Sequence, residues 1–176
     1  LQLGETPRLI KGDQMTGPKH SCGVVGISAD YDIAPSLYTA LMIIQHRGQE
    51  SAGISVFDGD SVETLKGNGL VNVALPKDAV RTIAGHVGVG HVRYSTTGSK
   101  GAINAQPFTV MTNFGTVAVA HNGDITNYSE LKEKYMKEGW TFLTDSDSEL
   151  VTKLLGKYMT MYNDPVKSIR AAMGEL

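Results

Sequence analysis

The sequence has no surplus of basic residues and no long apolar run. Its 176 residues include 16 Lys and Arg against 18 Asp and Glu, which gives a formal net charge of −2. A nucleic-acid-binding protein needs a basic surplus or stripe to meet phosphates, so this class is excluded. No stretch approaches the roughly 20 apolar residues of a membrane helix. Residues 1–21 contain Gly, Pro and charges where a signal peptide is apolar, so we expect a cytoplasmic protein without a membrane partner.

Cysteine is also nearly missing. The single cysteine, Cys22, cannot form an internal disulfide, which fits a reducing compartment. Hydrophobic residues make up 41% of the chain, enough to offset the entropy cost of ordering, which excludes a disordered protein. The length favours one domain.

The order of predicted elements places strands first and helices last. Strands in hairpins, followed by helices, indicate an α+β fold with an antiparallel sheet. A long loop, 95–107, separates two of the strands and is long enough to be functional. We expect strands at 23–29, 52–57, 62–67, 86–94, 108–112 and 116–122, and a helix from Pro35 to about residue 46.

Three helices are predicted to close the chain, each with a start signal. Asn127 and Ser146 each stand three positions before a glutamate, the spacing of a capping box. Asp164 precedes Pro165, which fits a cap before the first helical residue. The helix after Ser146 has the clearest apolar stripe.

Cys22 has two interpretations. A lone cysteine at the start of a strand is usually a small buried hydrophobic residue. If residues 1–21 were removed as a leader, however, the sulfur and a free α-amine would belong to the same residue. A free cysteine thiol has a pKa of about 8.5, and an α-amine, with a pKa of about 7.7–8.0, can take its proton and later protonate a leaving amine. The sequence therefore allows an N-terminal nucleophile.

The histidines give no metal site by their spacing. His86 and His91 lie five residues apart and so face opposite sides of one strand, and no H-x-x-x-H pair occurs. Most of the histidines are predicted to be structural. A Cys22–histidine pair of the papain kind stays open, although no local signature supports it.

Three further features also have a structural and a functional interpretation. His121-Asn122-Gly123 fits a turn, but an Asn amide beside an exposed Gly N–H is also suited to an oxyanion hole. Arg93, at a strand end, is either a solvated residue or a ligand for a carboxylate. Asp147 belongs to the predicted capping box, and from the first helical turn its carboxylate could meet a substrate ammonium.

Six segments together closely resemble the glutaminase domain of class II glutamine amidotransferases, in the amidophosphoribosyltransferase branch. They occur in the family's order across residues 22–149, and the second and third separate this branch from the glucosamine-phosphate synthase and asparagine synthetase branches. The segments are 22–27 (CGVVGI), 45–54 (QHRGQESAGI), 90–98 (GHVRYSTTG), 105–108 (AQPF), 121–123 (HNG) and 146–149 (SDSE).

The resemblance implies a four-layer αββα sandwich of the N-terminal nucleophile hydrolase type that hydrolyses glutamine to glutamate and ammonia through a cysteine thioester. It makes Cys22 the nucleophile, with its freed α-amine as the base, and Asn122 and Gly123 the oxyanion hole. Arg93 would bind the glutamine α-carboxylate and Asp147 the α-ammonium. Three residues would line or support the pocket: Arg47, Gly48 and Tyr94.

The resemblance also implies partners and cofactors. In the full-length enzyme, a homo-oligomer, the ammonia would react with phosphoribosyl pyrophosphate to give 5-phosphoribosylamine in the first step of purine synthesis. That phosphoribosyltransferase domain would bind Mg²⁺, and members with leaders can bind a 4Fe-4S cluster through downstream cysteines. No cofactor or metal is expected within these 176 residues.

The same comparison suggests boundaries. Residues 1–21 are expected to be a leader, with Met15 as an alternative start. Residues 22–176 are expected to be an incomplete glutaminase domain, because the family's domain continues beyond the position that matches Leu176. The phosphoribosyltransferase domain is expected to be absent, because no diphosphate-binding loop follows. Two alternatives remain open. One is a non-catalytic binding module that keeps the glutamine pocket but never frees Cys22, and the other is a stand-alone glutaminase.

Overall fold

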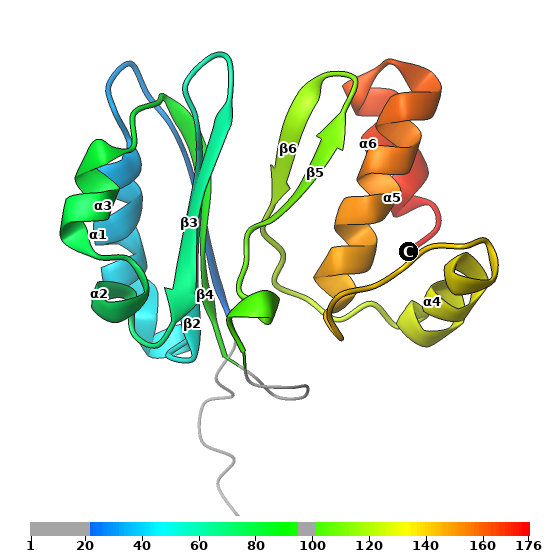
Figure 1. The fold of residues 1–176 in the computed structure, drawn as a ribbon, viewed down its shortest axis with the longest axis horizontal. Coiled ribbons are helices and arrows are strands. Elements are labelled where there is room, and N and C mark those ends of the chain that lie inside the picture. The colour runs from blue at the N-terminus through cyan, green and yellow to red at the C-terminus, as the bar shows by residue number, and fades with distance from the viewer. Residues whose placement is uncertain (1–21, 95–100) are drawn as a thin grey trace, which may run out of the picture.

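The computed structural model describes residues 22–94 and 101–176, and it arranges them in four layers (Figure 1). Helices α1 to α3 cover one side of a four-stranded sheet, a two-stranded sheet lies against its other side, and α4 to α6 form the far layer. This order confirms the predicted αββα sandwich. In chain order the elements are β1 (Gly23–Ser28), α1 (Ala34–Ile44), η1 (Gln45–Arg47), β2 (Ser51–Phe57), β3 (Val62–Asn68), α2 (Val71–Ala74), α3 (Lys77–Thr82), β4 (Val87–Arg93), η2 (Ala102–Asn104), β5 (Phe108–Thr112), β6 (Gly115–Val119), α4 (Tyr128–Lys137), α5 (Asp147–Tyr162) and α6 (Pro165–Met173).

The larger sheet is antiparallel with the order β1-β4-β2-β3. Ile54 on β2, Val92 on β4 and Leu41 on α1 are fully buried in the core beneath α1. A Cβ at Gly90 would lie 3.1 Å from Leu41 Cδ1, so glycine lets α1 pack closely against the sheet. The alternation of core and opposite-face residues along β4 sends His91 toward the second sheet.

The smaller sheet is the β5–β6 hairpin, closed where Thr112 pairs with Gly115. Gly115 has a φ of +93°, which a tight hairpin turn requires and which glycine adopts without strain. The predicted strand 108–112 is confirmed, and the strand predicted at 116–122 forms over Gly115–Val119. Helix α5 packs on this sheet so closely that a Cβ at Gly156 would lie 2.6 Å from Val110 Cγ2.

The three predicted C-terminal helices are present, but two of their predicted caps are wrong. Neither Asn127 nor Ser146 makes a side-chain capping bond, whereas Asp164 accepts from the main-chain N–H of Lys167 as expected. Glu149 instead accepts from the main-chain N–H groups of Leu143 and Thr144, at 3.0 and 2.7 Å. The carboxylate is therefore used by the chain that leads into α5.

Helices α2 and α3 have no signal in the sequence pattern. These helices have only 4 and 6 residues, too few to form a stable helix alone. The reason is that the first helical turn loses more conformational entropy than its one hydrogen bond offsets. Buried Val71, Leu75 and Val80 hold them against the core beside α1. Tertiary packing therefore decides these two elements.

Some predictions concern residues that the structure does not describe. The expected leader, 1–21, lies outside the described residues, as does the first part of the predicted loop, 95–100. The rest of that loop contains η2 and leads into β5. Over 22–94 and 101–176, no helix is both long and apolar enough to cross a membrane.

Glu175 joins the end of the described chain to α4 and α5. Its carboxylate accepts hydrogen bonds from the hydroxyls of Tyr135, at 2.6 Å, and Tyr158, and it pairs with Lys134 and Lys157 at 3.2 and 3.3 Å. Burial raises the pKa of Glu175, but these hydrogen bonds outweigh burial and lower its pKa to about 2. The ionised carboxylate is therefore favoured by folding.

We expect Glu175→Gln to lower the melting temperature at pH 7. We also expect the melting temperature of this variant to change less than that of wild type as the pH falls from 7 to 2. The ionised group stabilises the fold fully above the ordinary pKa of 4.5, and this contribution disappears as the pH falls toward 2. A loss of about 1 kcal/mol corresponds to about 2–4 °C in a domain of this size. Thermal melts from pH 7 to pH 2 measure the difference. Glu133→Gln, which removes an exposed pair with Lys137, is the control, and equal effects of both variants would contradict the prediction.

Candidate active site

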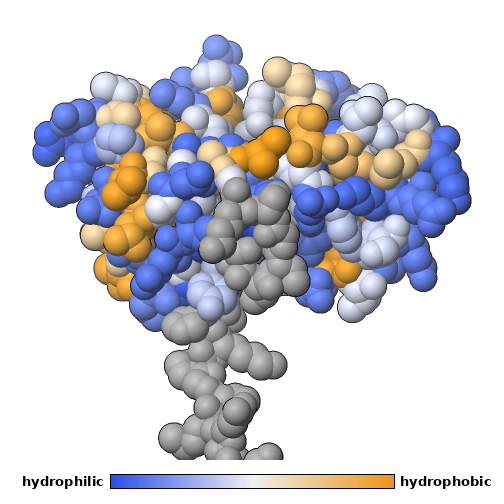
Figure 2. All heavy atoms as spheres, turned by 60° about the horizontal axis from the view of Figure 1, so that its bottom comes forward, coloured by the Kyte–Doolittle hydropathy of each residue, from blue (hydrophilic) through white to orange (hydrophobic). Residues whose placement is uncertain are grey.

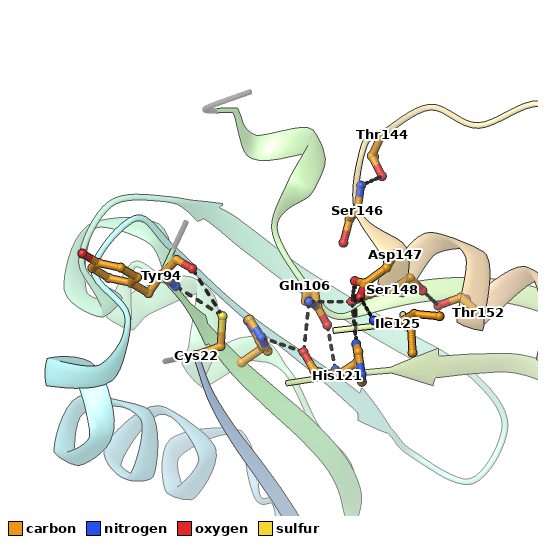
Figure 3. Close-up of polar contacts among 11 residues, drawn as sticks. Cys22, Tyr94, Gln106, His121, Ile125, Thr144, Ser146, Asp147, Ser148 and Thr152 are labelled. Atoms are coloured by element: carbon orange, nitrogen blue, oxygen red, sulfur yellow. Dashed lines mark hydrogen bonds and ion pairs between the residues drawn. The ribbon is translucent and has the colours of Figure 1, made fainter. Parts of the chain in front are cut away.

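Cys22 directly precedes β1, at the edge of the sheet where the antiparallel strand β4 ends. Gly23 pairs with Val92, so Cys22 comes opposite the end of β4 and next to Tyr94. The Tyr94 N–H donates to Cys22 Sγ at 3.4 Å, and the thiol lies 3.6 Å from the Tyr94 carbonyl (Figure 3). The main chain of Tyr94 therefore fixes the position of the sulfur of the predicted nucleophile at the edge of the sheet.

Two side chains from distant segments hold the carbonyl of Cys22. Asn122 Nδ2 donates to this oxygen at 2.8 Å, and Arg47 Nε donates at 3.2 Å. Asn122 is the predicted oxyanion-hole residue, and the structure places its amide beside the predicted nucleophile. Because a side-chain amide has two N–H donors, one is left to meet a substrate oxygen.

Gly48 and Gly123 lie where no side chain fits. A Cβ on Gly48 would lie 2.6 Å from the main chain of Arg93, so Gly48 supports the end of β4 and does not line the pocket. A Cβ on Gly123 would lie 2.6 Å from His121 Nε2. The predicted oxyanion segment is therefore packed against the ring of its own neighbour.

Arg93 ends β4 inside the pocket, and its guanidinium already has an acidic partner. Its Nη1 lies 3.0 Å from Glu50 Oε1, and the two side chains are only 11% and 19% exposed. Sequence reasoning assigned no role to Glu50, although it lies in one of the quoted segments. The pair fixes the guanidinium at the pocket wall, where its remaining N–H groups can meet a carboxylate.

Asp147 opens α5 and points its carboxylate toward the loop that follows β6. Its Oδ2 accepts from the Ile125 N–H at 3.0 Å, and its Oδ1 accepts from the Ser148 hydroxyl at 3.2 Å. His121 Nδ1 lies 3.8 Å from Oδ1. The Asp147 carboxylate is thus held in place at the cavity wall by a main-chain N–H and a hydroxyl.

These groups surround one cavity of about 430 Å³. Such a volume suits a small polar molecule. Cys22 and Tyr94 directly flank strands of the larger sheet, whereas Asn122, Gly123 and Asp147 come from the other half of the sandwich. Figure 3 shows Cys22 beside Tyr94 on one side and Asp147 on the other. Six of the eight predicted site residues line this cavity, namely Cys22, Arg93, Tyr94, Asn122, Gly123 and Asp147, whereas Arg47 and Gly48 lie outside its lining.

His91 lies fully buried beneath the cavity. Its Nε2 is 3.2 Å from the carbonyl oxygen of His121, which can only accept, so Nε2 carries the proton. Burial lowers the pKa of His91 to about 4. Its Nδ1 has no hydrogen-bond partner among the described residues. His91 is therefore a neutral structural donor to the segment that holds Asn122.

The described residues contain no grouping of three or more His, Cys, Asp or Glu side chains suited to a metal ion. The expected Mg²⁺ and iron–sulfur cluster belong to a phosphoribosyltransferase domain and to downstream cysteines, and they stay predictions. The predicted site residues bring a thiol, an amide, a guanidinium and a carboxylate to this cavity.

Comparison with known proteins decides the family. The glutamine amidotransferase domain family matches residues 76–169, more than half of the chain. The chain belongs to this family. An amidophosphoribosyltransferase from Archaeoglobus fulgidus is 45% identical over 150 residues, which are 84% of this chain and 33% of the relative. The corresponding enzyme from Methanocaldococcus jannaschii is 38% identical over 157 residues, 88% of this chain and 33% of the relative.

Solved structures agree with this assignment of a glutamine amidotransferase domain. A glutamine phosphoribosylpyrophosphate amidotransferase from B. subtilis, complexed with ADP and GMP, superposes with a TM-score of 0.78 at 32% identity. The match covers 87% of this chain and 32% of the B. subtilis chain. This glutamine amidotransferase domain therefore spans about a third of the length of the relatives it matches.

Sequence reasoning missed several residues that this amidotransferase domain brings to the cavity. Gln106 lies in the quoted segment 105–108 and Ser148 in the predicted capping box, but neither was given a role. Asp124 and Tyr128 also line the cavity. A buried amide without a periodic pattern around it gives no local signal. Only the meeting of the two sheets shows what it contacts.

Proposed function

We propose that this domain hydrolyses glutamine to glutamate and ammonia, with Cys22 as an N-terminal nucleophile. The observation that carries the proposal is that a thiol, a guanidinium, a carboxylate and an amide line the same cavity. Free glutamine presents an α-carboxylate, an α-ammonium and a side-chain amide, which match Arg93, Asp147 and the pair of Cys22 and Asn122. The family and the amidophosphoribosyltransferase relatives support the same reaction.

In the proposed reaction, Cys22 Sγ attacks the side-chain amide carbon of glutamine. As the S–C bond forms, the C=O electron pair moves to the oxygen, which accepts hydrogen bonds from Asn122 Nδ2 and the Gly123 N–H. The freed α-amine takes the thiol proton and passes it to the leaving nitrogen, which departs as ammonia. Water then attacks the thioester carbon, which releases glutamate and restores the thiol.

In the whole protein, we propose that the ammonia displaces pyrophosphate from phosphoribosyl pyrophosphate to give 5-phosphoribosylamine. This step rests on the relatives, which are named amidophosphoribosyltransferases and are about three times longer than the matched region. The described domain would supply the ammonia, and the partner substrate would bind elsewhere in the protein.

The charge assignment predicts a selective loss of glutamine binding. In the full-length processed protein, we expect Arg93→Ala or Asp147→Asn to raise the KM for glutamine about tenfold or more, because hydrogen bonds to charged groups contribute about 1.5–3 kcal/mol. The rate with free ammonia should change little. Asp147→Asn keeps an oxygen for the Ile125 N–H, so it tests the charge apart from the fold.

Asp164→Asn is a matched control, because Asp164 also accepts a main-chain N–H at the start of a helix but lies outside the cavity. Its KM for glutamine should stay unchanged. An unchanged KM in both the Arg93 and Asp147 variants would contradict the assignment. Processed wild-type protein that binds glutamine and releases no glutamate would favour the non-catalytic binding module.

A further inference from the structure

Gln106 lies at the centre of the hydrogen bonds beneath the cavity. It follows η2, it directly precedes Pro107, and its side chain is buried, with the residue only 5% exposed. Figure 3 shows its amide between His121 and Ser148, which belong to separate segments. No step of the proposed reaction uses this amide directly.

The first contact of the Gln106 side chain, with the main chain of His121, takes the place of a main-chain pair at the end of the β5–β6 hairpin. Phe108 pairs with Val119, so the same register, continued by two residues, puts Gln106 opposite His121. Pro107 has no N–H, and the main-chain ladder stops there. The side chain of Gln106 takes over, because its Oε1 accepts from the His121 N–H at 2.7 Å and its Nε2 donates to the His121 carbonyl at 3.2 Å.

The second link reaches the helix that begins at Asp147. Gln106 Nε2 also donates to Ser148 Oγ at 3.1 Å, and this hydroxyl donates to Asp147 Oδ1 at 3.2 Å. A primary amide has two N–H groups, so it can make both donations together. One buried amide therefore joins the residue before Asn122 to the residue after Asp147.

The geometry points to Gln106 as the positioning residue that holds the predicted oxyanion segment, Asn122 and Gly123, in register with the helix that carries Asp147. This inference rests on the proposed function. Oxyanion donors work only when they are fixed in advance, within about 0.5 Å of the productive position. His91 also donates to the His121 carbonyl, but among the described residues only Gln106 accepts from the His121 N–H. His121 Nδ1 also lies 3.1 Å from Ser148 Oγ, and this side-chain contact does not depend on Gln106. Loss of the amide therefore removes the two bonds that fix the main chain of His121 and leaves its ring as the remaining link to Ser148.

The test replaces the amide with groups of similar length. Gln106→Met removes every hydrogen bond, and Gln106→Glu keeps an acceptor for the His121 N–H while it loses both donations. In processed full-length protein, we expect kcat for glutamine hydrolysis to fall about 10- to 100-fold, less than the 10²–10³ typical of a deleted oxyanion donor. The KM should change by less than about threefold, because Asp147 keeps its bond from Ile125.

A second measurement separates positioning from a general loss of structure. Glutamate γ-semialdehyde can add the Cys22 thiol to form a tetrahedral hemithioacetal. The S–C bond forms, and the carbonyl electron pair moves to the oxygen, which takes up the thiol proton. We expect the Ki of this aldehyde to rise by about the factor by which kcat falls, since it imitates the tetrahedral state. The Ki of the product glutamate should change by less than about threefold.

Gln45→Met is the matched control. Gln45 Oε1 also accepts a main-chain N–H, from Val71 at 2.7 Å, but Gln45 lies outside the cavity. This variant should keep kcat and both Ki values. A Gln106→Met kcat within about threefold of wild type, or equal weakening of aldehyde and glutamate, would overturn the inference.

If Gln106→Met does not fold, Gln106→Glu tests the inference with the same two comparisons to wild type: the fall in kcat, and the rise in the Ki of the aldehyde relative to that of glutamate. Wild-type protein that binds glutamate and the aldehyde but hydrolyses no glutamine would overturn the proposed function instead. The Kd values of the aldehyde and of glutamate, measured by direct binding, would then still test the positioning role of Gln106.

Discussion

Protein that retains residues 1–21 is expected to hydrolyse glutamine at least about a hundredfold more slowly than protein that begins at Cys22. With Ser21 attached, the Cys22 nitrogen is an amide of negligible basicity, so the thiol loses its general base. General bases typically contribute about 10²–10⁴-fold. In the described structure, no histidine makes a hydrogen bond to Cys22 Sγ, whose two hydrogen bonds both involve the main chain of Tyr94.

The experiment makes both forms, confirms each N-terminus by intact mass, and measures glutamate release together with labelling by a glutamine-analogue electrophile. In the processed form, activity should fall as the pH drops below the amine pKa of about 7.7–8.0. Cys22→Ser, made in the processed form, controls for glutamine breakdown that does not depend on the thiol. Equal rates in the two forms would exclude the N-terminal nucleophile mechanism and favour a histidine-assisted Cys22.

Asn122→Asp should lower kcat for glutamine by about 10²–10³-fold, the usual effect of losing one oxyanion-hole donor. The change keeps the shape of the side chain but replaces its N–H₂ with an oxygen, and it places a negative charge where the oxyanion would form. Because the donor acts in the transition state, the KM should change far less than kcat. Steady-state kinetics of the processed protein measure both quantities.

Asn113→Asp makes the same chemical change at an exposed bond to Asn163, far from the cavity in the fold, and serves as the control. It should leave kcat unchanged. The bond from Asn122 Nδ2 to the Cys22 carbonyl is also lost in Asn122→Asp, so alkylation of Cys22 by iodoacetamide reports whether the thiol has moved. Unchanged kcat, or a kcat loss matched by an equal loss of alkylation rate, would contradict the oxyanion-hole assignment.

The capping signals show where local patterns succeed and fail. Asp164 caps α6 as predicted, because Pro165 fixes the backbone and the bond spans three residues. Ser146 has the same kind of local signal, yet Glu149 turns to the N–H groups of Leu143 and Thr144. The competing donors are close in sequence. Their conformation, however, depends on how the chain enters α5, which no short motif specifies.

In the candidate site too, some residues were predicted from the sequence and others are recognised only in the structure. The residue types at Cys22, Arg93, Asn122 and Asp147 indicated their chemistry, and the structure confirms that they share one cavity. Glu50 and Gln106 have ordinary surface-type side chains and no periodic surroundings, so the sequence alone gave them no role. Their partners, Arg93 and His121, lie 43 and 15 residues away in the chain.

What the sequence determined by itself is therefore local: hydrophobic periods of two and of three to four residues, turn residues, and the reactive groups at strand and helix ends. These patterns predicted the α+β class and all the strands and longer helices. The tertiary structure alone decided α2 and α3, the pairing of Arg93 with Glu50, and the amide of Gln106 that replaces a strand partner for His121. The physical reason is that a short helix or a buried hydrogen bond is stable only after distant segments have packed and excluded water.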